Sequence, residues 1–150
     1  MIQVEGLVVI ITGANNGIGL HMTEALLKQG YFVAGFDLEG DKLIVFQQSF
    51  PNKIMFYKTD VTKDVKVNES VKAVIDRWGK VDILVNNACL AIFSPFEQKD
   101  IEDTKLEFDV NYFGYVRMIS AVLPYMKARK KGIIHNVSSG VGITGFPGIY

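Results

Sequence analysis

The chain has 150 residues and a hydrophobic content of 49%, which suits one compact domain spanning residues 1–150 with a sizeable core. Its 16 basic and 16 acidic residues give a formal net charge of zero, which argues against a nucleic-acid-binding surface or a membrane-seeking face. No apolar run reaches the length of a membrane span, and the early first strand leaves no room for a signal peptide, so we expect a cytoplasmic protein.

Five apolar, strand-like runs alternate with helical segments along the chain. The runs cover residues 7–11, 31–36, 54–57, 81–85 and 132–137. This alternation predicts an α/β fold with a parallel sheet covered on both faces, because parallel strands need right-handed crossover helices. We expect a Rossmann-type, doubly wound sheet with strand order 3-2-1-4-5. The helices between the first strands are expected at 17–29 and 41–49.

The first apolar run leads into Thr12 and three glycines that open a helical segment. Glycine permits a tight turn and a close approach of the backbone to a pyrophosphate, and the start of a helix presents unpaired N–H groups and a partial positive charge. We therefore expect the phosphates of a dinucleotide over residues 13–19. The cofactor-binding residues expected in this stretch are Gly13, Asn15, Asn16, Gly17, Ile18 and Gly19.

The second apolar run ends in an acid, Asp37, which lies 18 residues after Gly19. At about this distance, dinucleotide-binding folds carry an acid that binds the adenine ribose hydroxyls. The 2′-phosphate of NADP would face this carboxylate, and neither Asn15, Asn16 nor Leu38 supplies a compensating cation. The pattern therefore predicts NAD as the cofactor. The alternative to a dinucleotide site is an ordinary glycine-rich loop followed by an acid that is simply exposed to solvent.

The spacing Gly-x3-Gly-x-Gly after Thr12 resembles the TGxxxGIG signature of the short-chain dehydrogenase/reductase family. Four later motifs, in the family's order, extend the resemblance over nearly the whole chain: Asp60-Val61, Asn86-Asn87-Ala88, Asn111 and Asn136-Val137-Ser138-Ser139. The resemblance implies an NAD-dependent oxidoreductase that transfers a hydride between the nicotinamide and a secondary alcohol or a ketone. The implied partner is a small-molecule alcohol or carbonyl substrate.

Two of these motifs carry cofactor contacts in the family. The resemblance places Asp60 and Val61 beside the adenine ring, although Asp60 or Thr62 could equally be a simple helix cap. It places Asn87 and Ala88 along the cofactor. Side-chain amides at the end of a strand can also bridge neighbouring strand carbonyls and reach a ribose.

The only cysteine in the sequence, Cys89, follows that motif at a position where the family usually has glycine. It excludes an internal disulfide and fits a reducing compartment. Its side chain would narrow the space near the nicotinamide ribose. A tolerated small residue, a redox-sensitive thiol and a nucleophile are the three interpretations, in decreasing order of support. Because His21 and His135 stand far apart without a cysteine pair, we expect no metal site.

Residues 90–103 are expected to form a loop with a short helix, and residues 104–130 one long helix. Its stripe of apolar and small residues is too wide for contact with the sheet alone, and the resemblance implies a homodimer or homotetramer that pairs through this helix. Asn111 lies within it at the place of the family's catalytic asparagine. An amide in mid-helix can interrupt the backbone ladder and hold a water, and the alternative is an ordinary helical asparagine.

The last strand run is followed by the sequence Ser-x-x-Gly, which by resemblance selects Ser139 as the catalytic serine that orients the substrate oxygen. The family's general base is the Tyr of a Tyr-x-x-x-Lys motif, which the 150 residues do not contain. Tyr150 lies too close to Ser139 for the family's usual spacing. We therefore expect this chain to be the amino-terminal portion of a single-domain enzyme, since ending here would leave the fifth strand as an exposed edge.

Two other functions compete with this interpretation. A catalytically silent NAD-binding regulator could use the same fold, because a fold does not fix a function. An S-adenosylmethionine methyltransferase also has a glycine turn and an acid after its second strand, but the glycine spacing and the Asn86-Asn87-Ala88 motif argue against it. Phe93, Phe96, Phe146 and Ile149 hint at an apolar substrate pocket, and packing would explain them equally well.

Overall fold

The computed structural model describes residues 4–144, in which strands and helices alternate from end to end. The strands are β1 (Val8–Thr12), β2 (Phe32–Asp37), β3 (Ile54–Lys58), β4 (Ile83–Asn86) and β5 (Ile133–Asn136). The α-helices are α1 (Gly17–Lys28), α2 (Asp41–Ser49), α3 (Asp64–Trp78), α4 (Ile101–Phe108) and α5 (Gly114–Ala128). Shorter helical turns are η1 (Phe96–Gln98), η2 (Asp109–Phe113) and η3 (Gly140–Gly142).

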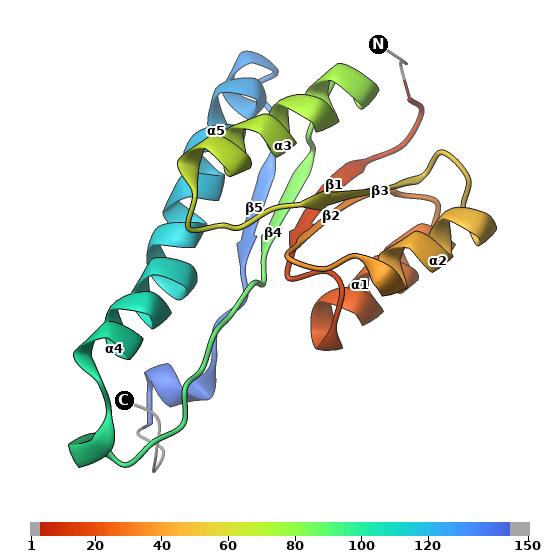
Figure 1. The fold of residues 1–150 in the computed structure, drawn as a ribbon. Coiled ribbons are helices and arrows are strands. Elements are labelled where there is room, and N and C mark those ends of the chain that lie inside the picture. The colour runs from red at the N-terminus through yellow and green to blue at the C-terminus, as the bar shows by residue number, and fades with distance from the viewer. Residues whose placement is uncertain (1–3, 145–150) are drawn as a thin grey trace.

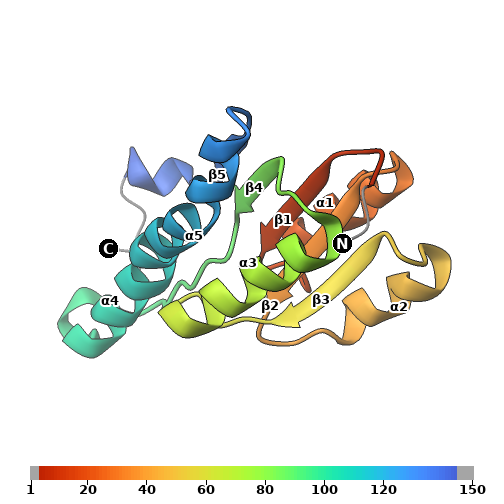
Figure 2. The same ribbon diagram turned by 90° about the horizontal axis from the view of Figure 1, so that it is seen from above.

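The five strands form one parallel sheet in the order β3-β2-β1-β4-β5. Helices α3 and α5 cover one face, and α1 and α2 cover the other (Figures 1 and 2). The predicted doubly wound α/β architecture and strand order are therefore confirmed. Within residues 4–144, no helix combines the length and the hydropathy needed to cross a bilayer.

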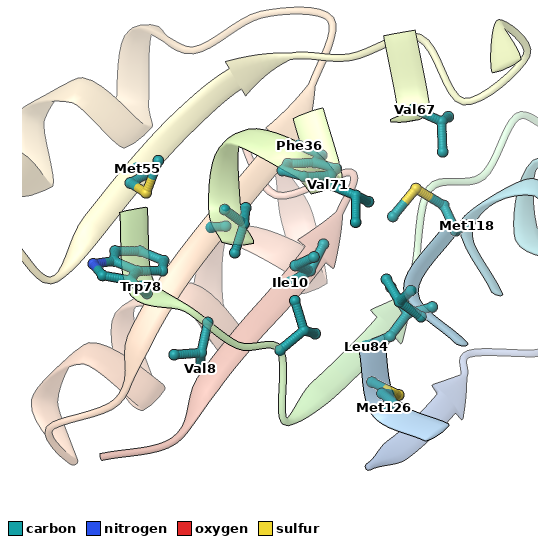
Figure 3. Packing of buried hydrophobic residues seen from close by; sticks show 14 of the residues in the cluster. Val8, Ile10, Phe36, Met55, Val67, Val71, Trp78, Leu84, Met118 and Met126 are labelled. Carbon is teal, nitrogen blue, oxygen red and sulfur yellow. The ribbon is translucent and has the colours of Figure 1, made fainter. Parts of the chain in front are cut away.

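Each face of the sheet has its own hydrophobic core. Figure 3 shows the larger one, in which Ile10 and Phe36 of the sheet meet Val71 of α3 and Met118 of α5. Trp78 is 2% exposed there and packs edge to face on the Phe32 ring at 5.6 Å. On the opposite face, residues such as Ile11, Leu27 and Leu43 pack together. Because both faces are buried, the central strand β1 is apolar at nearly every position.

The segment expected as a single helix over 104–130 differs from that prediction in two ways. It begins at Ile101, where the Asp100 carboxylate caps the first turn by accepting a hydrogen bond from the Glu102 N–H at 2.9 Å. It is also interrupted by η2, a π-helical turn over Asp109–Phe113 that separates α4 from α5. Such a turn is a rare single-turn insertion within an α-helix, and the apolar periodicity of the sequence did not predict it.

Candidate nucleotide-binding cleft

A cleft of about 650 Å³ opens at the carboxyl edge of the sheet, beside β1. The chain leaves β1 toward β2 on one side, and β4 flanks it on the other, so the cleft lies at the point where the strand order reverses. Of the predicted cofactor residues, nine line it: Gly13, Asn16, Gly17, Ile18, Asp37, Asp60, Val61, Asn87 and Ala88. The other two, Asn15 and Gly19, are buried beneath the glycine turn.

The glycine turn holds α1 against the end of β1. A Cβ atom on Gly19 would lie 2.0 Å from the Gly13 carbonyl oxygen, so only glycine permits this contact. Gly17 has a φ of +50°, and no described atom lies within 4 Å of where its Cβ would be. Among residues 4–144, no side chain caps the first turn of α1. The N–H groups of that turn, which have no partner within the helix, therefore fit a pyrophosphate.

Asp37 performs two tasks at the end of β2. Its Oδ2 atom accepts a hydrogen bond from the Asn15 N–H at 2.8 Å, and its Oδ1 atom accepts one from the Leu38 N–H at 2.7 Å. The carboxylate thus tethers the glycine turn to β2. Because two carboxylate oxygens offer about four acceptor sites, Asp37 retains capacity for a ligand hydroxyl on the cleft side.

Asn15 is 1% exposed, and its side chain is fully engaged with the start of α2. Its Oδ1 atom accepts from the N–H groups of Lys42 at 3.1 Å and Leu43 at 3.2 Å. Its Nδ2 group donates to Asp41 at 2.7 Å, a bond that holds the pKa of the Asp41 carboxyl below its ordinary value. The Asn15 side chain thus caps a helix from a distant part of the chain, and the prediction that Asn15 binds the cofactor concerns its place in the glycine turn.

The structure also places a cation that the sequence interpretation missed. The Lys42 ammonium group donates to the Oδ1 atom of Asn16, a residue that lines the cleft. Lys42 lies on α2, 26 residues after Asn16, so only the packing of α2 beside the glycine turn brings the two together. The sequence between residues 15 and 38 contains no sign of this contact, because Lys42 lies outside it.

The adenine end of the expected site is built around Asp60. Its Oδ1 atom accepts from both the N–H, at 2.9 Å, and the hydroxyl, at 2.7 Å, of Thr62. This compact turn ends before α3, whose N-cap is Lys63 and, in the described chain, makes no side-chain capping bond. The alternative that Asp60 or Thr62 caps this helix is therefore wrong, and Asp60, Val61 and Thr62 all face the cleft.

Thr12 and Asn87 bind the end of β1 to the segment after β4. The Asn87 Nδ2 group donates to the carbonyls of Thr12 at 3.0 Å and Gly13 at 3.1 Å, as the strand-bridging prediction requires. The Thr12 hydroxyl in turn accepts from the N–H groups of Asn87 and Ala88, each at 3.0 Å. These four bonds fix the cleft wall next to Cys89, which is exposed and also lines the cleft.

Asn111 lies in the π turn, where the regular α-helical hydrogen-bond ladder is interrupted. Its Nδ2 group donates to the Leu90 carbonyl at 2.7 Å, and its Oδ1 atom accepts from the Leu90 N–H at 2.8 Å. The amide thus holds the Leu90 peptide by both polar groups. Leu90 and Val110 line the cleft next to it, whereas Asn111 itself stands behind this wall.

Ser139 follows β5 at the same carboxyl edge and is exposed. Its Oγ atom accepts from the Val141 N–H at 3.3 Å. Nearby, the hydroxyl of Tyr115 on α5 donates to the Val137 carbonyl at 3.1 Å. Burial, with a smaller effect from Cys89, raises the pKa of the Tyr115 phenol, so it remains a hydrogen-bond donor at neutral pH.

The expected apolar substrate pocket rests on four residues. Phe93 and Phe96 are 66% and 69% exposed, respectively, so neither side chain serves as core packing. Phe146 and Ile149 lie outside the described residues, as does Tyr150.

A parallel sheet in this order, with a glycine turn and an acid on adjacent strand ends, defines a Rossmann-type nucleotide-binding protein. The sequence profile of the short chain dehydrogenase family matches residues 7–150. The chain therefore belongs to the short-chain dehydrogenase family, as the resemblance implied.

Two curated relatives illustrate the range of the family. The chain is 34% identical over 140 residues to a 3-ketodihydrosphingosine reductase of Bacteroides thetaiotaomicron, covering 93% of this chain and 49% of the relative. It is 35% identical over 149 residues to the 3-oxoacyl-[acyl-carrier-protein] reductase FabG of Thermotoga maritima, covering 97% and 61%. The chain thus spans about half to three-fifths of the length of these relatives.

Solved structures agree with the fold. A short-chain dehydrogenase from Streptomyces avermitilis superposes with a TM-score of 0.91 at 30% identity, covering 96% of this chain and 53% of the other. An NADP-bound structure of ElxO superposes with a TM-score of 0.89 at 29% identity, covering 96% of this chain and 60% of the other. An NAD+-bound xylitol dehydrogenase gives 0.88 at 30% identity, covering 96% and 57%. Structural neighbours therefore include both NADP-bound and NAD+-bound proteins.

Proposed function

We propose that the protein is an oxidoreductase that transfers a hydride between a nicotinamide dinucleotide and a secondary alcohol or ketone. The observation that carries this proposal is the cleft itself, in which an uncapped helix start at Gly17 faces Asp37 across the end of β1. A volume of about 650 Å³ suits a dinucleotide-sized ligand. The match of the chain to the short chain dehydrogenase family over residues 7–150 supports the same activity.

The bound nicotinamide would supply the hydride chemistry, and the residues of this chain would position the reactants. In this proposal, residues Gly13 to Gly19 hold the pyrophosphate, Asp37 the adenine ribose, and Asp60 with Val61 the adenine. Asn87 and Ala88 line the nicotinamide half. Ser139 orients the substrate oxygen by hydrogen bonding, and Asn111 acts from behind the cleft wall by fixing Leu90. A base outside residues 1–150 would take the hydroxyl proton.

The test of the reaction uses the intact protein with NADH or NADPH and two ketones of the kind that the relatives' names contain, 3-ketodihydrosphingosine and a 3-oxoacyl thioester. We expect cofactor oxidation with at least one ketone and a loss of at least 100-fold in kcat for Ser139→Ala, with unchanged NADH affinity. Tight NADH binding without turnover of either ketone would favour the silent NAD-binding regulator instead.

We further propose NAD as the preferred cofactor. The Asp37 carboxylate faces the place of the adenine ribose, where it would accept hydroxyl hydrogen bonds and repel a 2′-phosphate. The Lys42 ammonium group at the rim is the feature that would favour NADP, but the neighbouring Asp41 carboxylate interacts electrostatically with it and opposes it.

Three variants separate these charges. Asp37→Ala should weaken NAD binding at least tenfold and NADP binding less than threefold, as measured by calorimetric titration. Lys42→Ala should change both affinities less than threefold. Glu39→Ala is the matched control, because this neighbouring carboxylate does not line the cleft. Equal losses of both cofactors in Asp37→Ala would count against the ribose contact, and a selective loss of NADP in Lys42→Ala would assign the site to NADP.

We also propose that the protein resides in the cytoplasm. There we propose that it assembles into a homodimer or homotetramer through residues 104–130. Helices α4 and α5 and the η2 turn between them expose several large apolar side chains, among them Phe108 and Tyr112 at 58% and Phe113 at 49%. A contiguous set of exposed apolar side chains is typical of a protein–protein interface. Sedimentation of the intact protein should show a dimer or tetramer, and Phe108→Glu with Phe113→Glu should shift it toward the monomer.

A further inference from the structure

The π turn that carries Asn111 is held from one side by a single residue, Arg117. The N–H of Gly114 donates to the Asp109 carbonyl, which is the five-residue bond that closes the π turn. The Arg117 Nη1 group donates to the same carbonyl at 3.2 Å, and its Nη2 group lies 2.7 Å from the Asp109 carboxylate. The first residue of the π turn is therefore fixed through both its main chain and its side chain.

The same guanidinium group also reaches the segment between β3 and α3, part of which lines the cleft. Its Nε atom lies 3.1 Å from the Asp64 carboxylate at the start of α3, and Nη1 also donates to the Val61 carbonyl at 3.5 Å. One turn earlier on α5, Gly114 makes close contact with the same segment, because a Cβ there would lie 2.9 Å from Val61 Cγ2. Residues 114 and 117 of α5 thus join the π turn to the segment 60–64, of which residues 60–63 line the cleft.

The geometry points to Arg117 as a positioning residue that couples the adenine end of the cleft to the turn that carries Asn111. Val61 lines the cleft on one side of Arg117, and Asn111 fixes the cleft-lining Leu90 on the other. A ligand that orders segment 60–64 therefore also orders the π turn. The assignment of segment 60–64 to the adenine rests on the proposed function, whereas the hold of Arg117 on the π turn does not.

The chemistry requires arginine at this position. A planar guanidinium group presents five N–H donors in a fixed fork, and here it serves four acceptors that belong to three residues: Asp109, Asp64 and Val61. A lysine ammonium is a compact charge with three donors and cannot reach the π turn and the segment 60–64 together. Since the Asp64 side chain is 76% exposed, its ion pair adds little stability by itself, and its role is geometric.

The test is hydrogen exchange of the amides of residues 110–114 in the intact protein. Without ligand, we expect Arg117→Lys to exchange these amides at least tenfold faster than wild type. Arg129→Lys is the matched control, because Arg129, the residue directly after α5, makes a comparable pair of bonds, to Asp82 and the Val81 carbonyl, at the far end of the sheet. It should change these amides less than twofold. Unchanged exchange in Arg117→Lys would overturn the hold on the π turn.

Coupling is tested with saturating AMP, which carries the adenine but no nicotinamide. In wild type, we expect AMP to slow exchange at residues 110–114 at least fivefold. In Arg117→Lys this effect should disappear although AMP still binds. Asp64→Asn, which leaves the Asp109 contacts intact, should halve the AMP effect without altering exchange in the absence of ligand. An undiminished AMP effect in both variants would overturn the coupling. A wild-type protein that binds neither AMP nor NAD would overturn the proposed function, while the ligand-free comparison would still decide the role of Arg117.

Discussion

Alanine substitutions at Gly17 and Gly19 should separate the folding role of the glycine turn from its binding role. The two residues lie two positions apart at the start of α1, yet their surroundings differ completely. A Cβ at residue 19 would lie 2.0 Å from the Gly13 carbonyl oxygen, whereas real Cβ atoms essentially never come within 3.0 Å of another heavy atom. At residue 17 no described atom lies within 4 Å, and only the positive φ of +50° opposes alanine.

The cost of Gly19→Ala follows from the overlap. The backbone of α1 or of the turn must move by at least 3.0 − 2.0 = 1.0 Å, and neither side is a flexible side chain. Overpacking of this kind costs up to about 3 kcal/mol. For a chain of this size, a loss of about 3 kcal/mol lowers Tm by roughly 6–12 °C. For Gly17→Ala the left-handed conformation costs about 1–2 kcal/mol, so Tm should fall by roughly 2–8 °C.

Cofactor binding should separate the two variants further. The new methyl group of Gly17→Ala would lie in the cleft, where the pyrophosphate is proposed to approach the backbone, and should weaken NAD binding at least tenfold. The assay combines thermal melts with calorimetric titration of the intact protein. Gly140→Ala is the control, because its Cβ would meet no described atom within 4 Å and its φ is ordinary for any residue. If Gly19→Ala melted within 2 °C of wild type, the close contact of α1 with Gly13 would be refuted.

Two further predictions concern side chains that support the cleft. Asn15→Ala should lower stability by about 2 kcal/mol, because α2 loses its cap and the Leu43 N–H is left buried without a partner, whereas Asn16→Ala should change Tm by less than about 1 °C. Glu107→Gln should cost about 3 kcal/mol at pH 7, since it leaves the ammonium of Lys99, with 4% of its side chain exposed, without its carboxylate. Burial alone would raise the pKa of Glu107, but the hydrogen bonds from Lys99 and the Ile92 N–H hold that pKa below the ordinary 4.5, so the stabilisation is complete above pH 4.5 and is lost as the pH falls through the lowered pKa. The free energies of unfolding of wild type and Glu107→Gln, measured by urea denaturation between pH 7 and pH 3, should therefore converge at the acidic end. A difference that stays constant over this pH range would contradict the ion pair.

The fold could be predicted from the sequence because its determinants are local. Each strand is a short apolar run and each crossover a helical segment, and the rule of right-handed crossovers then leaves few arrangements of the sheet. The residues of the glycine turn are contiguous, so the positions of Gly13 and Gly17 along the cleft follow once β1 and α1 are recognised. The end of a helix is also local where a single residue decides it, as at Gly79, which follows α3 with a φ of +75°.

The roles of Asn15, Lys42 and Asn111 could not be predicted in the same way, because each depends on a contact between segments distant in the sequence. Asn15 bonds to residues 26 to 28 positions later, and Asn111 bonds to a residue 21 positions earlier. The π turn adds a second obstacle, since one inserted residue shifts every later side chain on the helix by about 100° while the apolar pattern remains readable. Sequence periodicity reports which face is buried, and it contains no information about which polar group lies opposite.

Several long-range hydrogen bonds satisfy backbone polar groups of segments at the cleft. Segments that line the cleft leave regular secondary structure, so their backbone N–H and carbonyl groups need other partners. Polar side chains from neighbouring segments provide them: Thr12 for Asn87 and Ala88, Asp37 for Asn15, and Asn111 for Leu90. A polar residue at the cleft can therefore have either of two roles: it can contact a ligand, or it can support the backbone that contacts the ligand. The sequence alone does not distinguish these roles. A substitution that removes only the support of the backbone should lower the affinity for the cofactor, because the cleft wall is displaced. The amides of that wall should then exchange faster with solvent even before any ligand is added.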